Sequence, residues 1–388
     1  MPRLKNIFRR ILIGLLRIAA GVPIVSLILC GLVFLVLAAT WTGRSVGLSG
    51  VVLGSVLFCS VGYWRRPWFR RVRRRFLGVL VPLGLVLYFV PLAIAPSGGR
   101  ADGRVRNCFL GGRGSFPRCS PWNVIPESDQ LRAGMYLLPL GERSVPQSEA
   151  ARMRSLVLPL YDEMDRNPDF RSLGSVMGIG YRDLLRLGCR TGHYFAVLPA
   201  TTGDRRVPCL VFLHGLGGNV KACLWVLARL ARESNCVVIA PTFGFGNWDR
   251  PDGARLVVEV VREAAATLPI DPARIYLMGY SNGAMGVTRT AIEAPDMFRG
   301  LIYLSPVTED ELFPAAGFAQ HARGRRVLFL HGGGDERIPR SLVEGSAASL
   351  RRLGCDVRLR VYESEDHWLL FSQPDAVLGE IRRFMDVN

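Results

Sequence analysis

The chain has 388 residues, which is enough for one large domain with extensions, and 49% of them are hydrophobic, a high share for a soluble protein. The first 120 residues hold 18 lysines and arginines against one acid, Asp102, and so carry the whole net charge of +17, whereas residues 121–388 are balanced. A nucleic-acid-binding domain would carry a basic face of its own, so this distribution argues against a nucleic-acid partner.

Three apolar runs, residues 18–40, 46–64 and 77–95, lie near the N-terminus, and each is long enough to cross a bilayer as a helix. No polar stripe interrupts them, as it would in core helices of a soluble domain. The first run has Ala38-Ala39 near its end, as a cleaved signal peptide would, but it is long for that and two more runs follow. We therefore expect residues 1–96 to form a membrane anchor of three spans.

Arginines predict the orientation of this anchor, because positive loops stay in the cytoplasm. Five basic residues precede the first run, the first linker has only Arg44, and the linker 65–76 has seven arginines. Since successive linkers lie on alternate sides of the membrane, the pattern predicts a multi-pass protein of the cytoplasmic membrane with its main domain outside. Five arginines between 100 and 118 argue against this orientation. A disulfide between Cys108 and Cys119 would suit an oxidising compartment.

Residues 97–175 are expected to be a linker and N-terminal extension with a helix near 148–164, and residues 176–388 to be the main domain. From about residue 190, short apolar runs alternate with amphipathic segments, which is typical of an α/β fold with a mostly parallel sheet. The expected strands are 193–198, 209–213, 236–240, 274–278, 301–304, 327–330 and 357–361, and the expected helices are 221–233, 253–268 and 282–293.

The segment GYSNG, residues 279–283, follows one of these strands and precedes a helix. It fits G-x-S-x-G, the nucleophile elbow, in which a sharp turn raises the serine above the sheet. Gly279 and Gly283 leave room for that turn. Ser281 is therefore the candidate nucleophile.

A serine nucleophile needs a base, and an acid to orient that base. Of the five histidines, His367 alone lies after the elbow and just past the last expected strand, while His214 and His331 end strands and are interpreted as loop anchors. Asp335 follows the strand 327–330 and completes the chain order Ser, Asp, His. The alternative acids are Glu336, Glu363, Glu365 and Asp366.

The glycine-rich segment LHGLGGN, 213–219, is the candidate oxyanion loop. We assign the two donors to the amides of Leu216 and Asn282, with Gly215 as the fallback for Leu216. The loop 243–251 either contacts substrate or caps buried aromatics. No zinc-type spacing, Walker loop or dinucleotide fingerprint is present, so we expect neither a metal nor a cofactor.

The segments HGLGG, GYSNG, LHGGGD and EDH, in this order, resemble the α/β-hydrolase family over roughly residues 190–388. The segment DPARIYLMGYSNGAMG is most similar to the branch of polyhydroxybutyrate depolymerases, feruloyl and acetyl-xylan esterases and prolyl-oligopeptidase-like enzymes. The acid loop departs slightly, with D-E-R-I-P in place of D-x-x-V-P. The resemblance implies hydrolysis through an acyl-enzyme on Ser281.

The sequence therefore predicts a membrane-anchored serine hydrolase that cleaves a small-molecule or polymeric carboxylic ester. Two alternatives stay open at this point. The same triad would serve a peptidase or an acyltransferase, and the domain would be a tethered binding module if it were catalytically silent.

Overall fold

The computed structural model describes residues 2–63, 67–96, 98–99, 103–112, 114, 121–141, 146–188, 191–200, 205–217 and 220–386, with only the backbone for most of residues 2–20. Two compact units make up the chain. The first consists of residues 1–95 and 117–150, and the second of residues 96–116 and 151–388. Cys119 lies outside the described residues, so its pairing with Cys108 stays a prediction.

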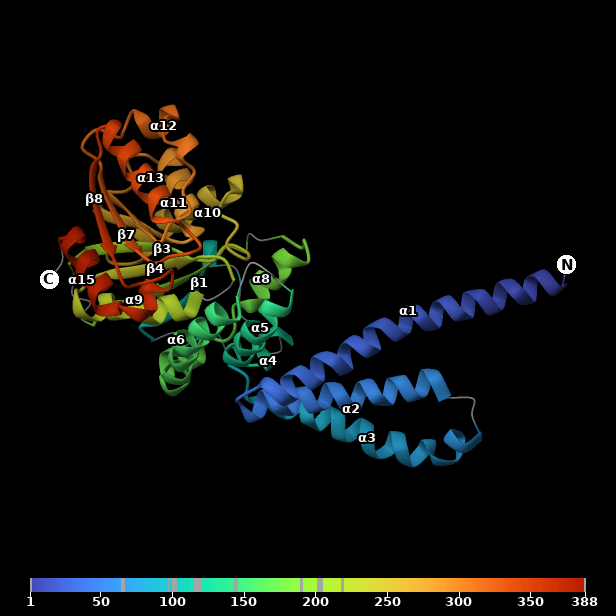
Figure 1. Cartoon of the computed structure of the whole chain (residues 1–388). Coiled ribbons are helices and arrows are strands. Elements are labelled where there is room, and N and C mark those ends of the chain that lie inside the picture. The colour runs from blue at the N-terminus through green and yellow to red at the C-terminus, as the bar shows by residue number, and fades with distance from the viewer. Residues whose placement is uncertain are drawn as a thin grey trace. The chain divides into compact units, whose positions relative to one another are not determined.

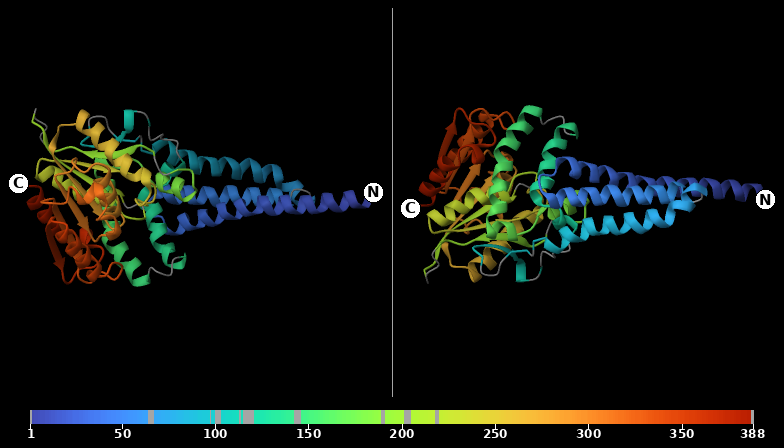
Figure 2. Two further views of the ribbon diagram at one scale, coloured as in Figure 1. Left: turned by 90° about the horizontal axis from the view of Figure 1, so that it is seen from above. Right: turned by 90° about the horizontal axis from the view of Figure 1, so that it is seen from below.

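Three long helices dominate the first unit: α1 (Pro2–Leu37), α2 (Trp41–Tyr63) and α3 (Pro67–Ile94). They run side by side, as both views of Figure 2 show. Gly31 of α1 lies against the backbone of α2 at Gly47, where a side chain would collide with it. Ser49 of α2 donates a hydrogen bond to the Gly84 carbonyl of α3 at 2.7 Å. Small residues and serine-to-backbone hydrogen bonds are how apolar helices associate without water.

Two of these helices, over Trp41–Val61 and Pro67–Ile94, are long and apolar enough to span a membrane. The described apolar part of α1 is shorter, Gly21–Leu37, so a third span stays a prediction. The helix α3 begins about ten residues before the expected run 77–95, because the arginine-rich linker is helical from Pro67 onward.

A short cap follows in the first unit, formed by α4 (Pro121–Val124) and α5 (Glu127–Gly141). Asp129 of α5 is fully buried, and its carboxylate accepts hydrogen bonds from the amides of Ala39 and Thr40, in the turn between α1 and α2. This carboxylate therefore fixes the cap to the end of the helical hairpin. The helix α6 (Gln147–Arg166) then leads into the second unit and contains the expected helix 148–164.

The second unit contains an eight-stranded sheet in the order β1-β2-β4-β3-β5-β6-β7-β8. Strands β3 to β8 are parallel, while β2 pairs antiparallel with both β1 and β4. The strands are β1 (Val105–Phe109), β2 (His193–Val197), β3 (Val207–Leu213), β4 (Val237–Pro241), β5 (Ile270–Tyr280), β6 (Gly300–Leu304), β7 (Arg326–Gly332) and β8 (Asp356–Tyr362).

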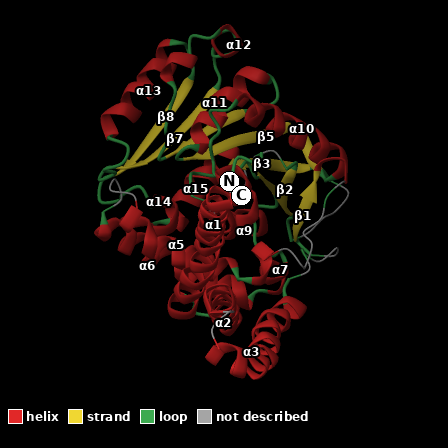
Figure 3. Cartoon of the chain, turned by 90° about the vertical axis from the view of Figure 1, so that its right-hand side faces the viewer, coloured by secondary structure: helices red, strands yellow, loops and turns green. Residues whose placement is uncertain are grey.

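Helices cover both faces of this sheet, with α10, α11 and α13 on one face and α9 and α15 on the other (Figures 1 and 3). The helix α9 packs through a stripe at i, i+3, i+4 and i+7, namely Leu224, Leu227, Ala228 and Ala231, all of which are buried as expected. The helices of this unit are α7 (Pro168–Ser172), α8 (Met177–Leu184), α9 (Val220–Glu233), α10 (Pro251–Thr267), α11 (Gly283–Glu293), α12 (Ala316–Ala319), α13 (Arg340–Arg352), α14 (Leu369–Ser372) and α15 (Pro374–Met385).

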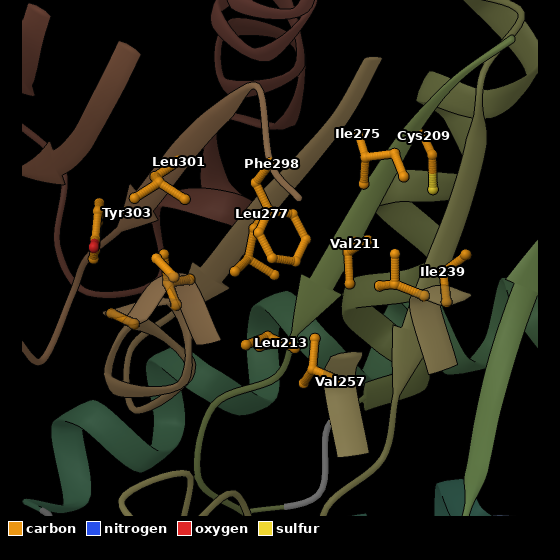
Figure 4. Packing of buried hydrophobic residues seen from close by; sticks show 14 of the residues in the cluster. Cys209, Val211, Leu213, Ile239, Val257, Ile275, Leu277, Phe298, Leu301 and Tyr303 are labelled. Carbon is orange, nitrogen blue, oxygen red and sulfur yellow. The ribbon is translucent and has the colours of Figure 1, made fainter. Parts of the chain in front are cut away.

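The central strands are buried on both faces, which is why they read as unbroken apolar runs. Figure 4 shows Val211, Leu277 and Leu301 from three adjacent strands in one cluster, with Val257 of α10 among them. All four side chains are fully buried. The expected strands are confirmed to within a few residues at their ends. The strand β1 was missed, since it lies in the segment interpreted as linker.

Candidate active site

The candidate site residues lie just beyond the carboxyl ends of four parallel strands. His214 follows β3, Ser281 follows β5, Asp335 follows β7 and His367 follows β8. Parallel strands end at the same edge of a sheet, and this edge is where α/β folds bind ligands. The fold therefore gathers residues that are up to 153 positions apart in the chain into one place (from His214 to His367).

Ser281 occupies a strained turn between β5 and α11. Its φ of +53° lies in the left-handed region, which residues other than glycine rarely adopt. A side chain at Gly279 would collide with the Gly283 backbone, and one at Gly283 would collide with the Leu213 carbonyl of β3. The Ser281 amide donates to the Leu304 carbonyl at 3.0 Å, which fixes the turn to β6. The local structure is that of a nucleophile elbow.

Ser281, His367 and Asp335 form one hydrogen-bonded chain. His367 Nε2 lies 3.1 Å from Ser281 Oγ, and His367 Nδ1 lies 2.8 Å from Asp335 Oδ2. An ionised carboxylate only accepts hydrogen bonds, so Nδ1–H donates to Asp335 and Nε2 is free to accept from the serine hydroxyl. The imidazole is thus in the tautomer that can remove the serine proton.

Asp335 is buried, and its second oxygen, Oδ1, accepts from the amides of Arg337 and Ile338, each at 2.9 Å. Burial by itself would raise the pKa of Asp335, but the hydrogen bond and the charge of His367, with the Ile338 amide, lower it below its ordinary value. The carboxylate therefore stays ionised while it is buried.

The other acids considered from the sequence point elsewhere. Glu363 pairs with Arg340, Glu365 accepts from Ser372 and Gln373, and Asp366 accepts from the Trp368 amide. Glu336 is exposed. The structure brings only Asp335 of this set to the imidazole, among the hydrogen bonds of the described residues.

Tyr280, the residue before Ser281, was not identified from the sequence as a member of the site. Its hydroxyl donates to the His367 carbonyl at 2.9 Å, and its ring stacks on the imidazole with centroids 5.5 Å apart. Burial raises the pKa of Tyr280, so the hydroxyl keeps its proton and remains a donor. Tyr280 thus links the elbow directly to the loop of the histidine.

The glycine-rich loop after β3 lies beside Ser281. A side chain at Gly215 would contact the Ser281 side chain at 3.3 Å. The amides of Leu216 and Asn282 have no acceptor within the part of the chain that the structure describes. An oxyanion hole requires two unpaired amides beside the nucleophile, so these two amides are its candidate donors.

His214 anchors this loop, as the sequence predicted. Its Nδ1 donates to the Gly215 carbonyl at 2.8 Å, and its Nε2 accepts from the Phe243 amide at 3.2 Å. Burial lowers the pKa of His214 to about 4, so the ring is neutral and can play both parts. His331 differs, because its Nδ1 lies 3.9 Å from Asp335 Oδ2, too far for a hydrogen bond. Among the described residues, no group of three or more His, Cys, Asp or Glu side chains could hold a metal ion.

The family comparison agrees with this geometry. Residues 210–328 match the model of the alpha/beta hydrolase family. The match shows that this segment is similar to the α/β-hydrolase family. The α/β-hydrolase match covers the glycine-rich loop, the elbow and Ser281, but it ends before Asp335 and His367, which the fold supplies from beyond it.

No curated protein matches the chain. Among solved structures, a thermostable esterase is 20% identical with a TM-score of 0.42 over 51% of this chain and 60% of its own. A butyrate-bound esterase of the Planctomycetes species Thermogutta terrifontis is 19% identical with a TM-score of 0.40, over 50% and 86%. A fluorophosphonate-binding serine hydrolase of Staphylococcus aureus is 16% identical with a TM-score of 0.42, over 50% and 92%. The chain thus spans less than two thirds of the first of these proteins.

The tight contact of Gly283 predicts a large effect of one added methyl group. Gly283→Ala forces the elbow away from β3, which we expect to lower stability by roughly 1–3 kcal/mol, because the Leu213 carbonyl cannot move aside. The matched control is Gly345→Ala in α13, where nothing lies within 4 Å of the added carbon. Thermal unfolding measures the stability of both variants, and an equal change in the two would contradict the account of the elbow.

The lowered pKa of Asp335 predicts a pH-dependent stability. A depressed pKa contributes stability above the unfolded value of about 3.9, and that contribution is lost as the pH falls through the folded value. Asp335→Asn should therefore unfold at a lower temperature than the wild type at pH 7, and the difference should shrink below about pH 4. Melting temperatures between pH 3 and 8 test this, and a difference that is independent of pH would refute it.

Proposed function

We propose that the protein is a membrane-anchored serine hydrolase that cleaves carboxylic esters through an acyl-enzyme on Ser281. The observation that supports this best is the chain of hydrogen bonds from Ser281 through His367 to Asp335, at 3.1 and 2.8 Å. A serine in an ordinary turn has no need of a strained φ, an imidazole on its oxygen and a buried carboxylate behind that imidazole.

Acylation begins when Ser281 Oγ attacks the ester carbonyl carbon while His367 Nε2 accepts the hydroxyl proton. The carbonyl π electrons move to oxygen and give a tetrahedral oxyanion. Asp335 stabilises the imidazolium that forms, since its ionised Oδ2 already accepts from Nδ1–H. The oxyanion then re-forms the carbonyl and expels the alcohol, which takes its proton from His367.

The amides of Leu216 and Asn282 hold the oxyanion. Asn282 stands at the first turn of α11, where the helix dipole also favours negative charge. Losing one such donor typically lowers the rate by about 10²–10³. Gly215 remains the alternative to Leu216, because both residues lie in the same loop beside the elbow.

Deacylation repeats these steps with water as the nucleophile. His367 removes a proton from water, the resulting oxygen attacks the acyl carbon, and Ser281 leaves as an alcohol with the proton returned by His367. An acyltransferase would use an alcohol or amine in place of water, and a peptidase would release an amine in the first stage. The choice among them depends on the substrate and not on the triad.

The helices of the first unit would hold this domain at the bilayer. Two of them have the length and apolarity of membrane spans, and α1 would provide the third. Seven arginines in the linker between the second and third expected spans favour a cytoplasmic position for that linker. The hydrolase domain would then lie on the extracytoplasmic side of the cytoplasmic membrane.

The chemistry is tested with p-nitrophenyl esters of increasing acyl length and the full chain in detergent. We expect Ser281→Ala to lower kcat by about 10⁴–10⁶, since the triad acts as a unit, and His367→Ala to do nearly the same. Ser155→Ala, an exposed serine of α6, is the control and should keep full activity. Hydrolysis that survives in Ser281→Ala would exclude this serine as nucleophile, and a folded wild type without esterase activity would favour the peptidase, the transferase or the binding module.

The anchor is tested by alkaline carbonate extraction of membranes from cells that express the full chain. A protein with spanning helices stays in the membrane pellet, because carbonate removes only proteins bound to the surface. Full release into the supernatant would contradict the anchor. Protease added to intact spheroplasts should then degrade the hydrolase domain, and protection of that domain would reverse the proposed orientation.

A further inference from the structure

Asp183 is a buried carboxylate that the proposed reaction does not use. It lies in α8, before the segment that matches the family, and its side chain is 4% exposed. A buried ionisable group is costly unless it is paired, so its partners indicate what it does.

Asp183 accepts three hydrogen bonds from described residues, and all three donors belong to the loop between β4 and α10. Its Oδ2 accepts from the Phe245 amide at 3.0 Å and from Asn247 Nδ2 at 3.2 Å, and its Oδ1 accepts from Arg250 Nη1 at 2.6 Å. Gly180, one turn earlier on α8, lies directly against the Phe245 ring. Residues 243–250, the β4–α10 loop, are thus clamped to α8 by one carboxylate.

The β4–α10 loop in turn contacts residues 214–217 of the candidate oxyanion loop. The Phe245 carbonyl accepts from the Gly217 amide at 3.2 Å, and Trp248 Nε1 donates to the His214 carbonyl at 2.8 Å. Gly246 lies so close to Gly215 and Leu216 that a side chain there would collide with the Gly215 carbonyl. The position of the β4–α10 loop therefore determines where the Leu216 amide points, even without contact between this loop and the substrate.

We propose that Asp183 is a positioning residue for the oxyanion hole, acting through the β4–α10 loop on the backbone of residues 214–217. This inference rests on the proposed function, because it assigns the support of a donor that the reaction uses. Arg250 and the Phe245 amide keep the carboxylate ionised: burial would raise the pKa of Asp183, but these hydrogen bonds lower it below its ordinary value. Two aromatic residues of the loop, Phe243 and Trp248, are fully buried, and their rings pack against each other with centroids 5.3 Å apart.

Asp271 provides a matched control. It also accepts from one main-chain amide, that of Ala273 at 3.0 Å, and from one arginine, Arg274 at 2.7 Å. It lies at the beginning of β5, whereas Ser281 follows the end of this strand. Replacing Asp271 removes similar interactions far from the oxyanion loop, so the comparison separates positioning from general loss of stability.

The experiment compares Asp183→Ala, Asp183→Asn and Asp271→Ala in the full chain in detergent. Asp183→Ala should lower kcat for p-nitrophenyl esters by about 10- to 100-fold with little change in KM. The reason is that loss of a supporting residue misplaces the oxyanion donor and not the substrate. Asp183→Asn, which keeps one acceptor oxygen, should fall between this variant and the wild type, and it serves as the test if Asp183→Ala does not fold. Wild-type kcat in a folded Asp183 variant, or an equal loss in Asp271→Ala, would overturn the proposal.

Hydrogen exchange gives a readout that does not depend on activity. The Gly217 amide, which donates to the Phe245 carbonyl, should exchange several-fold faster in Asp183→Ala than in Asp271→Ala at equal global stability. Unchanged exchange would refute the positioning role even if the enzyme is an esterase. Conversely, faster exchange in a protein whose activity does not depend on Ser281 would support the clamp and reject the proposed function.

Discussion

The sharp turn at Ser281 is the constraint on which the candidate site depends. A serine at φ +53° is held there because β5 and α11 meet across two glycines, with the backbone of Gly283 seated on the Leu213 carbonyl of β3. Such strain persists only where the surroundings over-determine it. Here those surroundings are the hydrogen bond to β6 and the contact with β3, which are the two neighbours of β5 in the sheet. The sheet therefore holds Ser281 in the strained backbone conformation that places its hydroxyl above the sheet.

The other residues of the candidate site are positioned by the ends of the strands that they follow and by hydrogen bonds among the loops. Tyr280 joins the elbow to the His367 loop, and neutral His214 joins the glycine-rich loop to the start of the β4–α10 loop. All three hydrogen bonds are buried, two of them join neighbouring loops, and none of them involves a substrate. This preorganisation is what electrostatic stabilisation of an oxyanion requires, because the donors need not reorganise during the reaction.

The parallel core and the candidate triad were predictable from the sequence for one physical reason. Strands buried on both faces give continuous apolar runs, and the residues that follow such runs must meet at one edge. The strand β1 was not predictable, because it is a partly exposed edge strand with a mixed pattern, VRNCF, in a stretch rich in glycine and arginine. The role of Asp183 was equally hidden, since an aspartate within YRDLL carries no sign of a loop 62 residues downstream at Phe245. Three membrane-spanning helices were predicted, and two of the described helices are long and apolar enough to be such spans.

The central claim is that Ser281 becomes acylated, and the most direct measurement is to trap that intermediate. The full chain is mixed with a p-nitrophenyl ester, quenched in acid within the first turnovers, digested and mapped by tandem mass spectrometry. The account predicts an acyl group on the peptide that contains Ser281, which disappears on longer incubation and is absent from Ser281→Ala. Rapid hydrolysis with no acyl group on Ser281, or with the acyl group on another residue, would contradict it.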